Sequence, residues 1–152
     1  MSASECVACP AGTYKPYFKD FDASNTYGYG YGWSCTLCPK GKYRGQNDPQ
    51  LYAWTDCYDC PAGYYAPSEG SLQCTACLPG SYSSQPGSQS CSSCPSGSYN
   101  PLYAATSCVA CPLGTYMQAL GAVADQCSSC PAGKYADAFG STVCKVCNTM
   151  LL

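Results

Sequence analysis

This chain lacks most of the residues that build a conventional protein core. It has no isoleucine, and Leu, Val and Phe together supply only 17 of its 152 residues. A composition this poor in large apolar side chains is typical of a disordered chain unless something else holds it together. The apolar fraction of 46% does not remove the problem, because Cys, Ala and Tyr supply most of it. The sequence therefore excludes a fold that rests on one large buried interior.

Histidine is also absent, and charged residues are few. Without histidine the chain cannot form the Ser-His or Cys-His pairs that activate nucleophiles. Seven Lys and Arg residues stand against nine Asp and Glu residues, with no run of one sign. Nucleic acids and anionic membrane surfaces select basic stripes, which are missing here. We therefore expect a protein that is not an enzyme, does not bind nucleic acid, and carries no cofactor or metal.

Long apolar runs are missing as well. A membrane-spanning helix needs about eighteen or more consecutive apolar residues, and the longest run of small apolar residues, 119–124, has six. We expect no membrane span in this chain. The N-terminal residues show no basic segment followed by an apolar one, so no signal peptide is apparent. We expect the sequence to be a piece of a longer precursor.

Cysteine, in contrast, is abundant and regularly placed. Eight Cys-x-x-Cys pairs contain all sixteen cysteines, and successive pairs are 29, 22, 17, 17, 17, 19 and 17 residues apart. This recurrence predicts an array of short repeats that pack against one another. A disulfide that closes a loop of about fifteen residues contributes roughly 3 kcal/mol, so covalent links can replace the missing core. The pairs are Cys6/Cys9, Cys35/Cys38, Cys57/Cys60, Cys74/Cys77, Cys91/Cys94, Cys108/Cys111, Cys127/Cys130 and Cys144/Cys147.

Each repeat has the form Cys-x-x-Cys-Pro-x-Gly-x-Tyr, with the proline displaced by one residue at Pro79. Proline suits the second position of a β-turn, and the glycine can take the positive φ that closes the turn. We expect the tyrosine to begin a short extended segment and to cover a disulfide with its ring. The glycines are Gly12, Gly41, Gly63, Gly80, Gly97, Gly114 and Gly133. The tyrosines are Tyr14, Tyr43, Tyr65, Tyr82, Tyr99, Tyr116 and Tyr135.

These observations predict a small disulfide-rich fold, an extended repeat rod of short β-hairpins and turns with little helix. Residues 117–124 are the best helical candidate, and their pattern is weak. The spacing divides the chain into three parts. Residues 1–56 hold irregular repeats with Tyr- and Trp-rich insertions, residues 57–147 hold regular repeats, and residues 148–152 form a tail.

The sequence alone does not choose among the possible cysteine pairings. A bond within one Cys-x-x-Cys closes a tight ring typical of redox motifs, whereas a bond from the second cysteine of one pair to the first of the next closes each hairpin. Geometry favours the second scheme, which leaves Cys6 and Cys147 to bond units outside it. The favoured bonds are Cys9–Cys35, Cys38–Cys57, Cys60–Cys74, Cys77–Cys91, Cys94–Cys108, Cys111–Cys127 and Cys130–Cys144.

Two other uses of the cysteines stay open. Taken two at a time, the pairs could form four-cysteine zinc sites in an intracellular scaffold, although the spacing is a little short for such sites. The equal central spacers also argue against a grouping by fours. A disulfide oxidoreductase is less favoured, because a catalytic Cys-x-x-Cys occurs singly at a helix N-terminus.

The two irregular spacers contain the candidate recognition residues. Tyr and Trp offer large, rigid contact surfaces with a polar group, as binding loops do. We therefore predict a protein-binding site there, with self-packing over the disulfides as the alternative. The predicted partner-binding residues are Tyr27, Tyr29, Tyr31, Trp33, Tyr52 and Trp54.

The repeat unit resembles the ephrin-receptor-like cysteine-rich repeat, most closely over residues 57–111 and less closely before Cys57. It is more loosely similar to the cysteine-rich modules of tumour-necrosis-factor and growth-factor receptors. The resemblance implies a disulfide-laddered rod that spaces or docks parts of large secreted or surface proteins, and it suggests the same second-to-first pairing. We expect a non-enzymatic structural or interaction module with protein partners. Its compartment would be extracellular, secretory or an oxidising organelle lumen.

Overall fold

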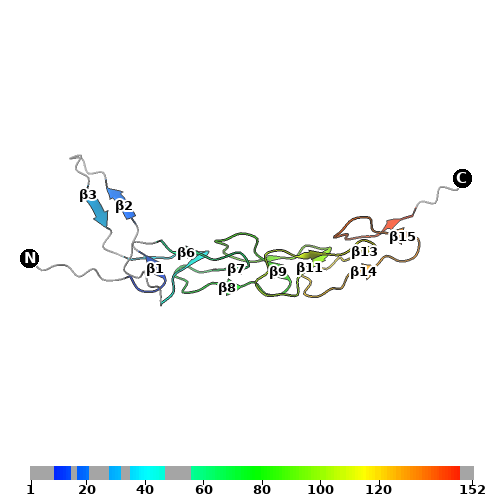
Figure 1. Ribbon diagram of the computed structural model, residues 1–152, viewed down its shortest axis with the longest axis horizontal. Helices are drawn as coiled ribbons and strands as arrows, with labels where there is room; N and C mark the ends of the chain where they lie inside the picture. The colour runs from blue at the N-terminus through cyan, green and yellow to red at the C-terminus, as the bar shows by residue number, and fades with distance from the viewer. Residues whose placement is uncertain (1–8, 15–16, 21–27, 32–34, 47–55, 148–152) are drawn as a thin grey trace, which may run out of the picture.

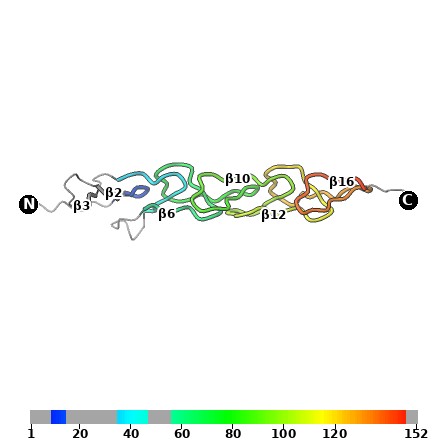
Figure 2. The backbone as a smooth tube through the Cα atoms, turned by 90° about the horizontal axis from the view of Figure 1, so that it is seen from above, coloured from blue at the N-terminus to red at the C-terminus, as the bar shows by residue number. Residues whose placement is uncertain are grey.

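The computed structural model describes residues 9–14, 17–20, 28–31, 35–46 and 56–147. They form an elongated rod with the two termini at opposite ends (Figure 1), and the rod is also narrow when turned by 90° (Figure 2). These described residues contain no helix, including residues 117–124. The predicted disulfide-rich rod of short hairpins is confirmed.

Sixteen short strands in the described part of the chain form eight antiparallel two-stranded ladders. Seven ladders have two residues in each strand, and the eighth pairs β2 (Tyr17–Asp20) with β3 (Gly28–Tyr31). The seven are β1 (Thr13–Tyr14) with β4 (Thr36–Leu37), β5 (Lys42–Tyr43) with β6 (Tyr58–Asp59), β7 (Tyr64–Tyr65) with β8 (Thr75–Ala76), β9 (Ser81–Tyr82) with β10 (Ser92–Ser93), β11 (Ser98–Tyr99) with β12 (Val109–Ala110), β13 (Thr115–Tyr116) with β14 (Ser128–Ser129), and β15 (Lys134–Tyr135) with β16 (Lys145–Val146).

Each Cys-x-x-Cys pair from Cys35 onward encloses a strand. The two residues between its cysteines form the second strand of a hairpin, as Thr75 and Ala76 do opposite Tyr65 and Tyr64. An isolated hairpin is marginally stable in water, and these strands are far shorter than usual. The disulfides beside them therefore hold the register.

Within the described residues, seven disulfides join the same cysteines as the favoured pairing from the sequence. Their Cα–Cα distances of 5.6–5.8 Å lie in the normal range for disulfides. Each bond defines one repeat. Repeats 1 to 7 are those closed by Cys9–Cys35, Cys38–Cys57, Cys60–Cys74, Cys77–Cys91, Cys94–Cys108, Cys111–Cys127 and Cys130–Cys144.

Each repeat begins with a β-turn, which we call its first turn. The glycine of every first turn has a φ of 77–85°, as predicted. The position of proline was predicted wrongly. The amide of Tyr64 donates to the carbonyl of Pro61, so the proline is the first residue of the turn and Gly63 the third. Only in repeat 4, where the bond runs from Ser81 to Leu78, does Pro79 occupy the second position.

The tyrosine of the repeat ends a strand instead of beginning one, which corrects a second prediction. Tyr65, for example, is the last residue of β7. The next residue leaves the hairpin because the amide of Ala66 donates to the carbonyl of Ser88 in the following repeat, at 3.1 Å. Contact between repeats thus ends the extended segment.

Cysteine supplies most of the buried apolar side chains in the described part of the chain. The second cysteines of five successive pairs are completely buried: Cys38, Cys60, Cys77, Cys94 and Cys111. One small apolar cluster joins Cys111 to Met117 and Ala122. The buried Arg44 donates from Nη1 to the carbonyl of Thr13 at 3.4 Å, across the junction of repeats 1 and 2. Stability therefore comes from disulfides and backbone bonds along the rod.

Candidate interaction surfaces

Backbone hydrogen bonds join each repeat to the next. In repeat 3, the amide of Gly63 donates to the carbonyl of Ser83 at 2.8 Å, beside the bond from Ala66 to Ser88. The bond made by Ala66 recurs at the equivalent residue of repeats 2 to 6. The faces between neighbouring repeats are thus occupied by the rod itself and are not available to a partner.

A second contact reaches two repeats ahead. Repeats 3 to 7 have a second turn with positive φ, formed at Gly70, Gly87, Ala104, Gly121 and Gly140. A Cβ at Gly41 of repeat 2 would overlap the carbonyl oxygen of Gly87 in repeat 4. The same overlap occurs in repeats 1, 3, 4 and 5. The first-turn glycine is therefore required by its conformation and by the close approach of another backbone.

The second turns also donate hydrogen bonds to earlier parts of the rod. The amide of Gly87 donates to the carbonyl of Cys60 at 2.8 Å, and the equivalent bond forms in repeats 3 to 7. Within residues 9–147, repeats 1 and 2 have no repeat two positions before them. These two repeats carry the long spacers, so no such contact restricts their length.

One of these spacers forms a separate hairpin. Strands β2 and β3 pair from Tyr17 with Tyr31 to Asp20 with Gly28, and the hairpin points away from the rod axis (Figure 1). The predicted binding residues Tyr29 and Tyr31 lie on β3. The other four, Tyr27, Trp33, Tyr52 and Trp54, lie outside the described residues.

An aromatic pair that the sequence did not reveal borders the other long spacer. Tyr43 on β5 and Tyr58 on β6 have ring centroids 5.9 Å apart with tilted planes, and Tyr58 is exposed. The two residues are register partners across the ladder of repeat 2. Tyr43 belongs to the repeat motif, but Tyr58 lies between two cysteines where no other repeat has an aromatic residue. Their pairing becomes visible only once the register is known.

Charge is sparse along the rod. Lys42 and Asp59 form an exposed ion pair at 3.2 Å, and Lys145 and Asp137 form another at 2.8 Å. The hydrogen bond from Lys145 lowers the pKa of Asp137, and the same bond raises the pKa of Lys145. Exposed pairs of this kind contribute little to stability and do not mark a catalytic site.

Fourteen of the sixteen cysteines are disulfide-bonded, so their sulfurs are not thiolate ligands in this structure. In the part of the chain that the structure describes, no three His, Cys, Asp or Glu residues are placed to hold a metal ion. Across the same residues, no helix has the length and apolarity needed to cross a bilayer.

Comparison with protein families assigns the repeat. Residues 52–90 and 80–126 each match the family described as tyrosine-protein kinase ephrin type A/B receptor-like. These are ephrin-receptor-like cysteine-rich repeats. The two overlapping matches cover most of repeats 3 to 6, whose disulfides and first turns are described above. No curated protein sequence matches the chain.

The ephrin-receptor-like repeat is a non-catalytic module. Its presence, together with seven disulfides, fits an extracellular interaction module that faces an oxidising environment. Such an environment is where disulfides of this density persist. The family says nothing of which surface of this chain makes the contact.

Proposed function

We propose that this chain is a docking arm of a larger extracellular or lumenal assembly. In this proposal, residues 57–147 form a spacer, and the insertions in residues 1–56 contact a protein partner. The observation that carries it is the β2–β3 hairpin. It lies wholly inside the loop closed by Cys9–Cys35, it is the one described ladder with four residues in each strand, and it leaves the rod (Figure 1).

The composition of this hairpin suits recognition. Register places Tyr17 opposite Tyr31 and Lys19 opposite Tyr29. Aromatic residues offer contact area at a low cost in side-chain entropy, and interfaces are enriched in them. The two tryptophans of the chain, Trp33 and Trp54, belong to the same pair of spacers. We therefore propose all six predicted aromatic residues as contact residues.

The test is a variant with Tyr29, Tyr31, Trp33 and Trp54 changed to Ser. We expect it to lose the proteins that the wild-type chain retains from a secreted fraction, measured by quantitative mass spectrometry. A matched control changes the exposed Leu102, Tyr103 and Leu120 of the rod to Ser and should retain them. Equal retention by both variants would rule out the insertions as the contact surface.

Intact mass after alkylation separates the docking arm from the zinc and oxidoreductase alternatives. Without reductant, we expect labelling at no cysteine other than Cys6 and Cys147, because the remaining fourteen are bonded. Labelling of all sixteen thiols after treatment with a chelator alone would favour the zinc alternative and rule out the disulfide-bonded rod.

A further inference from the structure

The C-terminal end of the rod has an uncovered stacking surface. The first-turn glycines of repeats 1 to 5 are buried, and each lies against the second turn of the repeat two positions ahead. Gly114 and Gly133 in repeats 6 and 7 are exposed, and no described residue lies within 4 Å of a Cβ built on either. Both keep the same positive φ as the others, so the surface is already shaped for a neighbour.

At this end, two backbone groups have no backbone hydrogen-bond partner among the described residues, although the equivalent groups of interior repeats have one. In repeats 2 to 6, the amide six residues after the second cysteine donates to the next repeat, as Met117 does to Ser141 at 3.0 Å. The equivalent amide of Ala136 donates to no described residue. The carbonyl of Cys130 likewise accepts no bond from a described second turn, whereas that of Cys111 accepts one from Gly140.

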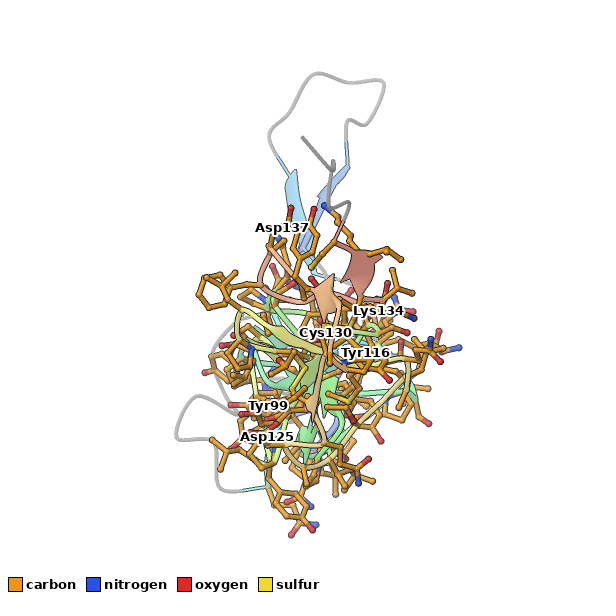
Figure 3. The ribbon with its side chains drawn as sticks, turned by 90° about the vertical axis from the view of Figure 1, so that its right-hand side faces the viewer. Tyr99, Tyr116, Asp125, Cys130, Lys134 and Asp137 are labelled. Atoms are coloured by element: carbon orange, nitrogen blue, oxygen red, sulfur yellow. A yellow bond between two sulfur atoms is a disulfide. The ribbon has the colours of Figure 1, made fainter. Side chains whose placement is uncertain are left out.

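Cys147 is held in the geometry of an interior cysteine. Its amide donates to the carbonyl of Gly133 at 2.9 Å, as the amide of Cys94 does to Gly80 at 2.9 Å. Cys94 is completely buried, whereas Cys147 is exposed with a free thiol. Figure 3 looks onto this end, with Cys130 near the middle of the cross-section and Asp125 and Asp137 toward opposite edges.

We propose that this end is an interaction surface for one further cysteine-rich repeat of the same kind, stacked as an eighth repeat in the register of the first seven. This inference does not depend on the docking role of the insertions.

The contacts between interior repeats indicate which features the eighth repeat must have. It needs a second turn with positive φ, whose carbonyl lies over Gly114 as that of Gly121 lies over Gly80. In two of the five interior contacts, an apolar side chain two residues beyond that turn adds to the contact. Val123 supplies one, with Cγ1 3.0 Å from a Cβ built on Gly80, and Leu72 does so over Gly12 at 3.3 Å.

The test adds the eighth repeat to the chain. A copy of residues 61–91 placed directly after Cys147 supplies two repeats, with three cysteines to pair with Cys147 and with each other. We expect amide exchange of Ala136 to slow by at least about tenfold, because the amide of this already buried residue gains a hydrogen-bond acceptor. The control carries a Gly-Ser extension of equal length and should leave this exchange unchanged.

Gly114→Ala gives a second readout in the same two chains. In the Gly-Ser control it introduces only a side chain at positive φ. In the repeat-extended chain it should also meet a carbonyl, as Gly41→Ala does in repeat 2. We therefore expect Gly114→Ala to lower the melting temperature more in the repeat-extended chain, by an amount similar to Gly41→Ala.

Three results would overturn the proposal. The first is unchanged exchange at Ala136 although alkylation shows that all added cysteines are bonded. The second is free thiols in the extended chain both with this graft and with a copy of residues 78–108. The third is dimerisation of the unextended chain, measured by sedimentation, that Gly133→Trp abolishes, because a second copy would then be the occupant.

Discussion

Repeats 3 to 5 have a partner two positions away on both sides, whereas the repeats at either end have one on one side only. All seven share the same turn, strands and disulfide, so the differences between them come from their neighbours. Repeats 3 to 5 have cysteines 14 positions apart, but the separation is 26 and 19 in repeats 1 and 2. Repeat 6, which also has a partner two positions earlier, has its cysteines 16 positions apart. A partner two positions earlier therefore goes with a short spacer.

The opposite end shows the complementary effect. Repeat 7 also has its cysteines 14 positions apart, because its second turn still stacks on repeat 5. Its first turn and Cys130 are more exposed than those of repeats 3 to 5. Earlier neighbours thus limit the length of a repeat, and later neighbours bury its second cysteine and first-turn glycine.

Removal of a disulfide should have the largest effect and should be greater in the interior. Changing Cys77 and Cys91 to Ser should cost about 3 kcal/mol in unfolding free energy from loop entropy alone, plus the burial of polar groups at completely buried Cys77. The same change at Cys130 and Cys144 opens a loop of equal length, but both hydroxyls then lie at half-buried positions that water can reach. Urea unfolding of both variants measures the difference, and equal costs would contradict the role of later neighbours.

An insertion should separate the two kinds of spacer. Five Gly and Ser residues inserted between Ser84 and Gln85 should cost about 2 kcal/mol, because the second turn of repeat 4 loses its hydrogen bonds to earlier repeats. The same insertion between Asn47 and Asp48 of repeat 2 should cost only the small entropy of a longer loop, well under about 1 kcal/mol. Thermal unfolding of both proteins is the measurement. A large loss of stability from both insertions would contradict the difference between the two kinds of spacer.

Ala104→Gly should stabilise the middle of the rod. Ala104 has a φ of 54° and is the one non-glycine residue with positive φ in the described part of the chain. A side chain in this conformation costs about 1 kcal/mol, which glycine avoids. Since other second turns already have glycine, this change makes repeat 5 like its neighbours. Chemical denaturation should show the gain, with Ala105→Gly as a control that gains nothing.

The smallest effect should come from the ion pair of repeat 7. The hydrogen bond from Lys145 lowers the pKa of Asp137 below its ordinary value of 3.8. The contribution of this ion pair to stability is therefore present above about pH 4 and is lost as the pH falls through the lowered pKa. Because the pair is exposed, Asp137→Asn should leave global stability nearly unchanged. An NMR titration of the Asp137 carboxyl group checks the direction, and a raised pKa would contradict it.

Much of the local structure could be predicted from the sequence. Pro-x-Gly after a cysteine predicts a turn with positive φ, and every first-turn glycine has one. The low content of large aliphatic residues and the short spacers predicted hairpins with little helix. The turn position of proline and the place of tyrosine at the end of its strand were missed. The position of proline follows from a hydrogen bond within the turn, as from Tyr64 to Pro61. The end of the strand follows from a bond to the next repeat, as from Ala66 to Ser88, which no motif within one unit expresses.

The candidate surfaces divide in the same way. The long spacers and their aromatic residues are visible in the sequence, and the structure adds that one of them forms the β2–β3 hairpin away from the rod. The contact of Tyr43 with Tyr58 and the uncovered surface at Gly114 and Gly133 could not be predicted. They depend on strand register and on which repeats lie side by side.

By itself, the sequence determined the repeat unit and the reliance on cysteine instead of an apolar core, because cysteine count, turn residues and spacing act over a few positions. Only the tertiary structure decided that each repeat contacts the repeats one and two positions away. These contacts run from backbone to backbone, so almost any side chain is compatible with them. Glycine is the exception, since the absence of a Cβ lets the carbonyl of a distant turn approach.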